Sequence, residues 1–299
     1  MPSIEELIPR VEAWKHAKNI SSTLLPGGIT NLNYRVDVDG NAFVVRIGGE
    51  GTQWHGIERA REYACHTIAA SLGIAPPILA FIEPEGYLIT RFIPGRKISP
   101  EEMCTSAMLS RVAAALHKIH DGRVFPGEFS AFRVFENYLQ TARRFNAPLP
   151  KNIDEIKRRV REIESATSSY PRVPCHNDLL NENFLDDGLA LWVLDWEYAA
   201  MGDVFFDLAN FADHHEFKDE AEHSFLAAYF GRVETSAHAR LKLMRAMSQI
   251  REAMWGVAQT AISKLDFDFG GYADKFFTRF QQTTSDPCFH EWLHAVAQS

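Results

Sequence analysis

Alternating apolar and polar residues mark a β-rich segment near the start of the chain. Residues 33–38 alternate, residues 42–47 are rich in β-branched and aromatic side chains, and Asp39-Gly40-Asn41 separates the two runs. Asp-Gly between two such runs is typical of a hairpin with a tight turn. The pattern therefore predicts two antiparallel strands joined by this turn.

The residues that follow extend the same small unit. A helical pattern covers residues 58–72 and ends at Gly73, and two further strand patterns, 78–82 and 86–92, flank a turn. Pro94-Gly95 then interrupts the pattern, and we interpret this break as a hinge. The first lobe is therefore predicted to be a small antiparallel sheet with one helix, spanning residues 1–93.

From Pro100 onward, apolar residues recur mainly at helical spacing. Ser99-Pro100 is a favourable helix start, with proline in the first turn. The predicted helices cover residues 101–120, 152–168, 205–214, 220–231 and 237–265, and two short strands are expected at 184–185 and 191–194. The fold class is therefore α+β and bilobal, with a larger helical lobe over residues 94–299.

Composition excludes several classes of protein. The chain has 299 residues, 46% of them hydrophobic, but no apolar run approaches the roughly 18–20 residues of a membrane span. Its first residues lack the basic and apolar regions of a signal peptide. The four cysteines are far apart and form no Cys-x-x-Cys pair, which favours a reduced, cytoplasmic location over a disulfide framework or a zinc site. A net charge of −8 without a basic cluster argues against a nucleic-acid partner.

The clearest chemical signal is the segment His176-Asn177-Asp178, with Asn183 five residues after the aspartate and Asp195 twelve residues further on. In phosphoryl transfer, one carboxylate orients the acceptor hydroxyl, and an amide and a second carboxylate hold Mg²⁺ on the nucleotide phosphates. Asp178 is therefore the predicted catalytic residue, and Asn183 and Asp195 are the predicted metal ligands.

Neighbouring residues receive supporting roles. Glu197 either contributes to the metal site or pairs with an arginine. His176 is expected to fix the loop through hydrogen bonds, and Asp207 either supports this loop or is an ordinary acid at a helix start.

The first lobe carries the candidate nucleotide-binding residues. Gly28, Thr30 and Asn31 lie in a glycine-containing segment before the first hairpin strand, where backbone amides can approach phosphates. Arg46 occupies the strand position where protein kinases carry the lysine that holds the α- and β-phosphates, and Glu62 is its expected acidic partner on the helix.

These motifs resemble those of the choline/ethanolamine kinases, within the wider group of aminoglycoside-phosphotransferase-like proteins. The segments that carry the resemblance are 27–31, 45–47, 91–95, 176–184, 194–199, 206–210 and 255–257. The resemblance implies an arginine at position 46 and an ATP- and Mg²⁺-dependent reaction. It also implies that Arg91, Phe92 and Ile93 hold the adenine through their backbone.

The resemblance also implies an acceptor site built from aromatic residues and acids around an ammonium group, which aromatic faces attract. Tyr198 and Trp255 fall on matching positions, and Asp178 contacts the acceptor. Ala258 departs from the family pattern, where a second tryptophan is common. That side of the site is therefore either thinner or closed by Phe267, Phe269 or Tyr272.

The sequence thus predicts a cytoplasmic kinase that phosphorylates the hydroxyl of choline or ethanolamine and has no membrane or nucleic-acid partner. A kinase of another small alcohol, such as thiamine, an aminoglycoside or a sugar, is the first alternative. A nucleotide-binding pseudokinase scaffold is the second, although the complete set of Asp178, Asn183 and Asp195 argues against it.

Overall fold

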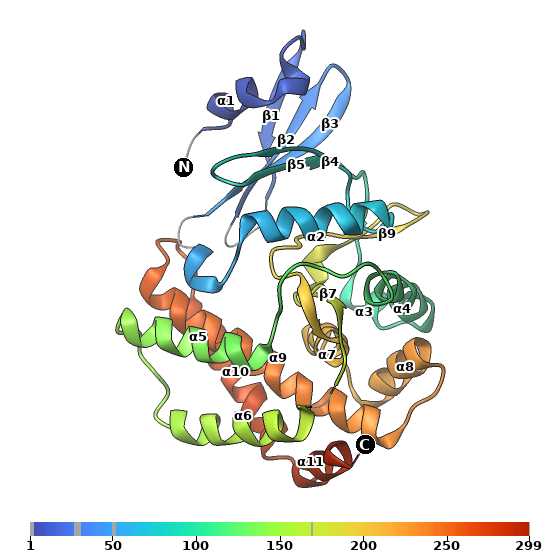
Figure 1. Cartoon of the computed structure of the whole chain (residues 1–299), viewed down its shortest axis with the longest axis vertical. Coiled ribbons are helices and arrows are strands. Elements are labelled where there is room, and N and C mark those ends of the chain that lie inside the picture. The colour runs from blue at the N-terminus through green and yellow to red at the C-terminus, as the bar shows by residue number, and fades with distance from the viewer. Residues whose placement is uncertain (1–2, 27–30, 50–51, 169, 299) are drawn as a thin grey trace.

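A computed structural model describes residues 3–26, 31–49, 52–168 and 170–298. A β-sheet lies at one end of the molecule, and helices make up most of the other end (Figure 1). This arrangement is the predicted α+β fold. No helix in the described ranges combines the length and the apolar character that crossing a bilayer requires.

The sheet at the first end has five antiparallel strands in the order β1-β2-β3-β5-β4. Its members are β1 (Ile20–Leu24), β2 (Asn31–Val38), β3 (Asn41–Gly48), β4 (Ile78–Ile82) and β5 (Tyr87–Arg91). Val38 pairs with Asn41 across a two-residue turn in which Asp39 and Gly40 have φ values of 46° and 86°. This positive-φ geometry is what the Asp-Gly signal predicts. The edge strand β1 was not predicted, because its apolar residues are few and half-exposed.

Helix α2 (Arg59–Ser71) connects β3 to β4, as predicted. The core of this end joins inward-facing strand residues, such as Val36, Val45 and Ile89, to Leu7 of the short helix α1 (Ile4–Leu7) and to Trp14. Burial of these side chains fixes the sheet register, because a slip of one residue would turn them toward solvent.

The second end is helical, with two small strand groups. The helices are α3 (Pro100–Met103), α4 (Ser106–His120), α5 (Ala131–Arg144), α6 (Ile153–Thr167), α7 (Val204–His214), α8 (Asp219–Phe230), α9 (Thr235–Ile262), α10 (Phe269–Thr284) and α11 (Phe289–Ala297). The strands are β7 (Arg172–Cys175) paired with β10 (Ala200–Asp203), and β8 (Phe184–Asp186) between β6 (Arg96–Lys97) and β9 (Leu191–Val193).

The single helix expected over residues 101–120 is wrong. The chain forms α3 and α4 instead, and Thr105 caps the second helix by accepting a hydrogen bond from the Met108 amide at 3.4 Å. A threonine side chain that bonds to nearby backbone favours such a cap over a helix interior. Helices α5, α10 and α11 were not predicted.

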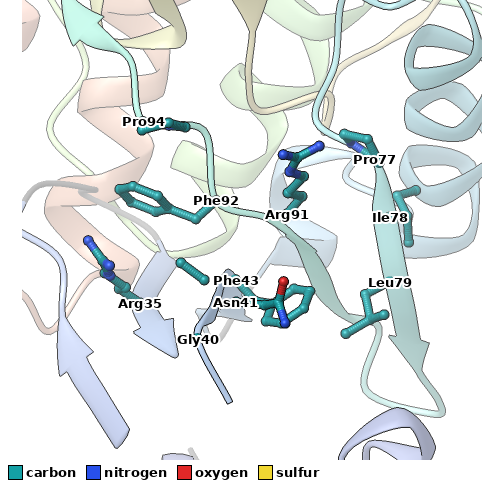
Figure 2. A pocket seen from close by; sticks show the side chains of 11 residues that line it. Arg35, Gly40, Asn41, Phe43, Pro77, Ile78, Leu79, Arg91, Phe92 and Pro94 are labelled. Carbon is teal, nitrogen blue, oxygen red and sulfur yellow. The ribbon is translucent and has the colours of Figure 1, made fainter. Parts of the chain in front are cut away.

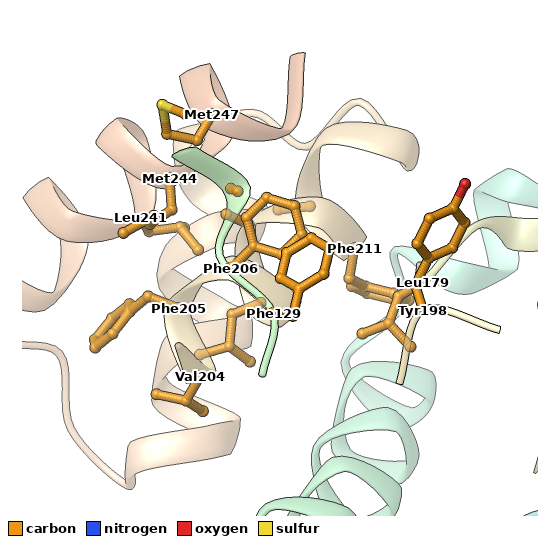
Figure 3. Close-up of a cluster of buried hydrophobic side chains, with 14 of the residues drawn as sticks. Phe129, Leu179, Tyr198, Val204, Phe205, Phe206, Phe211, Leu241, Met244 and Met247 are labelled. Atoms are coloured by element: carbon orange, nitrogen blue, oxygen red, sulfur yellow. The ribbon is translucent and has the colours of Figure 1, made fainter. Parts of the chain in front are cut away.

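Helix α9 is the central element of the helical end and packs against α5, α7, α10 and α11. Figure 3 shows part of the hydrophobic core that α7 and α9 share, which includes Phe206 and Phe211 of α7 and Leu241, Met244 and Met247 of α9. Because α7 and α9 are held by this core, side chains that project from them toward the loop after β7 have fixed positions.

Glu222 of α8 ties that helix to α9. Its side chain is completely buried and bonds to His238 at 2.9 Å, to Lys242 at 2.7 Å and to Arg245. Burial alone would raise the pKa of Glu222, but the hydrogen bond from His238 and the charges of Arg245 and Lys242 lower it from 4.5 to about 2. A lowered pKa in the folded state means that the carboxylate stabilises the protein above pH 4.5 and that this stability is lost as the pH falls toward 2.

Glu222→Gln is therefore expected to lower the free energy of unfolding at pH 7 by about 3 kcal/mol and to flatten its pH dependence between about pH 4.5 and 2. Urea unfolding across this pH range measures both effects. The exposed Glu220 of the same helix is the control, because Glu220→Gln removes a charge without a buried partner. Equal effects of the two changes would contradict the assignment.

Candidate active site

Side chains of helix α7 fix the loop after β7, residues 176–183, by accepting hydrogen bonds from its backbone. Asp207 accepts hydrogen bonds from the His176 amide at 2.8 Å and the Asn177 amide at 2.5 Å, and Asn210 accepts one from the Leu179 amide at 2.6 Å. Asn177 has a left-handed backbone with φ of 64°, a conformation that asparagine tolerates. The support expected from Asp207 is confirmed. We call residues 176–183 the catalytic loop, after the role that the sequence predicts for Asp178.

His176 is a structural residue, as predicted. Its Nδ1 accepts a hydrogen bond from the Asp178 amide at 3.2 Å, so its Nε2 donates to the Leu194 carbonyl at 2.9 Å. Burial lowers the pKa of His176, which keeps this neutral tautomer at physiological pH. The histidine thereby links the catalytic loop to the segment that carries Asp195.

Asp178 pairs with an arginine that the sequence did not reveal. Arg251 of α9 donates from Nη1 to Oδ1 of Asp178 at 2.7 Å. The Oδ2 atom of Asp178 accepts no hydrogen bond from a described residue, and the side chain is 10% exposed. Burial raises the pKa of Asp178, and the Arg251 guanidinium opposes this rise. One carboxylate oxygen is thus held, while the other remains available to a ligand.

Asn183 and Asp195 are brought together by the backbone. The Leu194 amide donates to the Asn183 carbonyl at 2.8 Å, and the Asn183 side-chain amide donates to the Asp178 carbonyl at 2.8 Å. The Asn183 side-chain oxygen is therefore left to act as an acceptor. Asp195 has φ of 60°, a left-handed conformation that is uncommon outside glycine and frequent at functional sites.

The donor set fits a hard divalent cation. Withdrawal from water and the neighbouring Glu197 carboxylate raise the pKa of Asp195 to about 7, despite the opposing charge of Arg46. Such an accumulation of carboxylate charge is relieved by a cation, and carboxylate and amide oxygens are the ligands that Mg²⁺ prefers.

An ion-pair network crosses from the sheet and α2 to this segment. Arg46 of β3 pairs with Glu62 of α2, as predicted, and also donates to Asp195 Oδ1 at 2.7 Å. Arg59, which sequence reasoning missed, bonds to Glu62 at 2.7 Å and to Glu197 at 3.1 Å. Of the two roles expected for Glu197, pairing with an arginine is therefore present.

Asn31 joins the same network, bonding to Glu197 and Arg59 at 3.3 Å each. Its side chain is thus engaged with protein groups. Gly28 and Thr30, the other two residues predicted to contact phosphates, lie outside the described residues.

Arg46→Ala is expected to raise the KM for ATP and lower kcat while leaving the KM for the acceptor nearly unchanged. A charge-assisted hydrogen bond contributes about 1.5–3 kcal/mol, or roughly a ten- to hundredfold loss in kcat/KM for ATP. Arg46→Lys should recover part of the loss, because lysine restores the charge but not the planar fork. Steady-state kinetics with ATP varied measure this, and unaltered ATP kinetics in Arg46→Ala would contradict the role.

The segment that we interpret as a hinge follows β5. The Arg91 and Phe92 amides donate to the Pro77 and Ala42 carbonyls at 2.9 and 3.0 Å, whereas the buried Ile93 amide donates to no backbone carbonyl of the described residues. Arg91 and Phe92 also line a pocket of about 510 Å³ beside the turn at Gly40 (Figure 2). Arg46, Asp178 and Asp195 are not among its lining residues. Of the three predicted adenine contacts, Ile93 therefore keeps its backbone donor available.

Two of the predicted acceptor residues, Tyr272 and Trp255, are linked to Arg251 through Glu252. Tyr272 of α10 donates to Glu252 Oε2 at 2.6 Å, and Arg251 bonds to Glu252 Oε1 at 2.6 Å. The Tyr272 and Phe269 rings meet Trp255 edge-on at 5.4 and 5.7 Å. A chain of direct contacts thus joins this aromatic wall to Asp178.

Phe267, Phe269 and Tyr272 form one aromatic cluster with Trp255. Phe267 packs on Phe269 at 4.8 Å and on Tyr272 at 6.1 Å. Gly256 permits the close approach of α10 to α9, because a Cβ there would lie 3.1 Å from the Ala273 Cβ and so hold the two helices apart. Ala258 is completely buried, and closure of its side of the site by these aromatic residues stays a prediction.

Tyr198 differs from Trp255 in that a cationic side chain of the protein lies over its ring. The Arg251 guanidinium lies 4.4 Å from the centre of the Tyr198 ring, and the Tyr198 hydroxyl is 3.3 Å from that of Tyr138. One face of Tyr198 is thus already occupied by a protein cation. No arginine or lysine of the described chain is recorded over the Trp255 ring.

The fold and this arrangement of Asp178, Asn183, Asp195 and Arg46 define a protein-kinase-like phosphotransferase. A choline/ethanolamine kinase family protein from Mesorhizobium loti is similar over 98% of both chains, with a TM-score of 0.85 and 30% identity. A probable ethanolamine kinase from Nematostella vectensis is 26% identical, over 96% of this chain and 95% of its own. The structure of LicA in complex with AMP shares the fold, with a TM-score of 0.78 and 21% identity over 97% of this chain and all of its own.

The family model for choline/ethanolamine kinase matches residues 23–282. The chain therefore belongs to the choline/ethanolamine kinase family, and the predicted class, a phosphotransferase with an alcohol acceptor, is confirmed.

Proposed function

We propose that the protein transfers the γ-phosphoryl group of ATP to the hydroxyl of choline or ethanolamine. The observation that carries this proposal is the chain of contacts from Asp178 through Arg251 and Glu252 to Tyr272, which places an aromatic and acidic wall beside the catalytic carboxylate. An aromatic wall attracts a poorly hydrated ammonium group, and a carboxylate adds opposite charge.

Asp178 is the residue that acts on the acceptor in this proposal. With Oδ1 held by Arg251, Oδ2 accepts a hydrogen bond from the alcohol and directs the oxygen lone pair toward the γ-phosphorus. It takes the proton as the new P–O bond forms, while the bond from the γ-phosphorus to the β,γ-bridging oxygen breaks and ADP leaves. Catalysis of this kind depends mainly on position, because phosphoryl transfer needs little covalent help from the protein.

The nucleotide is held by residues of both lobes. Arg46, fixed by Glu62, neutralises phosphate charge, and the Ile93 amide donates to the adenine. Asn183, Asp195 and, when released from Arg59, Glu197 would hold Mg²⁺, which neutralises the charge that develops on the β- and γ-phosphates when it is bound. The AMP bound to LicA supports an adenine nucleotide as the donor.

A substrate screen tests the proposal. Purified protein with ATP and Mg²⁺ is supplied separately with choline, ethanolamine, thiamine and an aminoglycoside, and ADP release is coupled to detection of the phosphorylated alcohol. We expect turnover of choline or ethanolamine at the highest kcat/KM. Preference for thiamine or an aminoglycoside would overturn the acceptor assignment, and binding of ATP without any turnover would favour the scaffold alternative.

Trp255→Leu is expected to raise the KM for the amino alcohol while leaving that for ATP unchanged. Leucine keeps apolar bulk but removes the ring quadrupole, a loss of about 1–2 kcal/mol, or roughly a five- to thirtyfold rise in KM. The effect should be larger for choline, because the primary ammonium of ethanolamine can still hydrogen-bond to an acid. Trp192→Leu, the same change at a half-buried tryptophan of β9 that bonds to Asp187, is the matched control. Lower thermal stability of Trp255→Leu without a change in KM would make Trp255 a packing residue.

A further inference from the structure

Arg251 is the least expected charged residue of the site. Its side chain is 3% exposed, and it lies on α9, 73 residues from Asp178 in the sequence. It contacts three groups of the acceptor side: the Asp178 carboxylate, the Glu252 carboxylate and the face of the Tyr198 ring. These contacts fix the guanidinium in position and orientation.

The hydrogen bonds of Arg251 are distributed unevenly. Nη1 alone serves both carboxylates, at 2.7 Å to Asp178 and 2.6 Å to Glu252, whereas the buried Nε donates to no described group. The Nε of Arg245, on the same helix, is also buried without a partner, so the feature that distinguishes Arg251 is the sharing of one Nη1 donor between two carboxylates. The arrangement places one shared donor between the catalytic carboxylate and a second acid.

Glu252 holds Arg251 from the opposite side. Its Oε2 accepts from the Tyr272 hydroxyl at 2.6 Å, and its Oε1 lies 3.7 Å from His214 Nε2. Because Tyr272 belongs to α10 and His214 to α7, Glu252 and its ion pair are fixed by two elements besides their own.

We propose that Arg251 is a positioning residue for phosphoryl transfer: it holds Asp178 by Oδ1 so that Oδ2 is the oxygen presented to the acceptor hydroxyl. This inference rests on the proposed function. In it, Arg251 acts through Asp178, and Glu252 with Tyr272 fixes Arg251, so the aromatic wall and the catalytic carboxylate are aligned by one buried chain of contacts. Misplacement of a reacting group by about 1 Å is enough to cost roughly a hundredfold in rate.

The same helix offers an internal comparison. Arg245 of α9 is also largely buried and also serves two carboxylates, Asp213 and Glu222, neither of which belongs to the catalytic loop. Arg245 therefore has the burial and charge pairing of Arg251 without contact to Asp178, which makes it a matched control.

The test compares three variants by Tm and by steady-state kinetics with ATP and the acceptor varied separately. Arg251→Lys keeps a cation between the two carboxylates, so it is expected to fold. Its kcat should fall about tenfold with the KM for ATP within twofold of wild type, because one flexible ammonium does not reproduce the fixed fork. The charge-balanced double change Arg251→Gln with Glu252→Gln should lower kcat about a hundredfold. Arg245→Lys should lower Tm and leave kcat unchanged.

Two results would overturn the inference: a folded Arg251→Lys variant with wild-type kcat, or an equal fall of kcat in Arg245→Lys, which would show that turnover follows the stability of α9. If the double variant does not fold, Arg251→Lys alone decides. A wild-type protein that phosphorylates a different alcohol defeats the choline or ethanolamine assignment instead, and the Arg251 comparison is then made with that alcohol.

Discussion

Replacing Asp178 by Asn is expected to lower kcat by about 10³-fold while MgATP binding survives. Asparagine keeps an oxygen for the Arg251 Nη1 donor, so the catalytic loop retains its contact with α9, but it cannot take the proton from the acceptor hydroxyl. Because Asp178 is proposed to contact the acceptor and Arg46 pairs with Glu62 and Asp195 instead, nucleotide affinity should change little.

Two measurements distinguish a catalytic role of Asp178 on the acceptor from a role in nucleotide binding. Rapid-quench or coupled assays give kcat, and calorimetry gives the Kd for MgATP. Asp187→Asn, at the turn between β8 and β9, is the control for the same change outside the site. A near-normal kcat would exclude Asp178 as the catalytic residue, and lost nucleotide binding in a folded variant would assign it to the nucleotide side.

Asp195→Ala is expected to abolish the Mg²⁺ dependence of nucleotide binding. Changing a residue that merely supports a metal ligand costs 10–100-fold in metal affinity, so removing a charged ligand should cost at least about 100-fold. Asn183→Ala should cost less, because a neutral amide contributes less to a divalent cation than a carboxylate does. Titration of the two variants with ATP at several Mg²⁺ concentrations gives the apparent affinities.

The wild type and Arg46→Ala provide the comparison for this experiment. Arg46→Ala should weaken ATP binding with and without Mg²⁺, whereas Asp195→Ala should remove only the part that depends on the metal. Normal MgATP binding by Asp195→Ala would place the metal elsewhere.

The features of the fold and the site that could be predicted from the sequence are those that depend on residues close together along the chain. The turn at Asp39-Gly40, the spacing of Asp178 and Asn183, and Asp195 after its strand are each set by a few neighbouring residues. The Arg46–Glu62 pair was predicted because its two elements follow each other along the chain.

The parts that were missed depend on distant packing. Arg251 and Glu252 lie in a helix where charged residues normally face solvent, and only the contact of α9 with the catalytic loop reveals that both are buried. Arg59 was passed over for the same reason, because its partner Glu197 is 138 residues away. The break between α3 and α4 was missed because one cap at Thr105 outweighed a continuous helical pattern.

The bonds that Arg46, Arg59 and Asn31 make to Asp195 and Glu197 connect the sheet and α2 to the segment that is predicted to bind the metal. The same side chains are those that we expect a nucleotide and its cation to engage. The side chains of the sheet and α2, and those of the segment with Asp195 and Glu197, are thus preorganised. An incoming ligand replaces one protein partner of each side chain and finds that side chain already aligned. Much of the conformational entropy of these long charged side chains is then lost during folding. Ordering them therefore offsets less of the free energy of ligand binding.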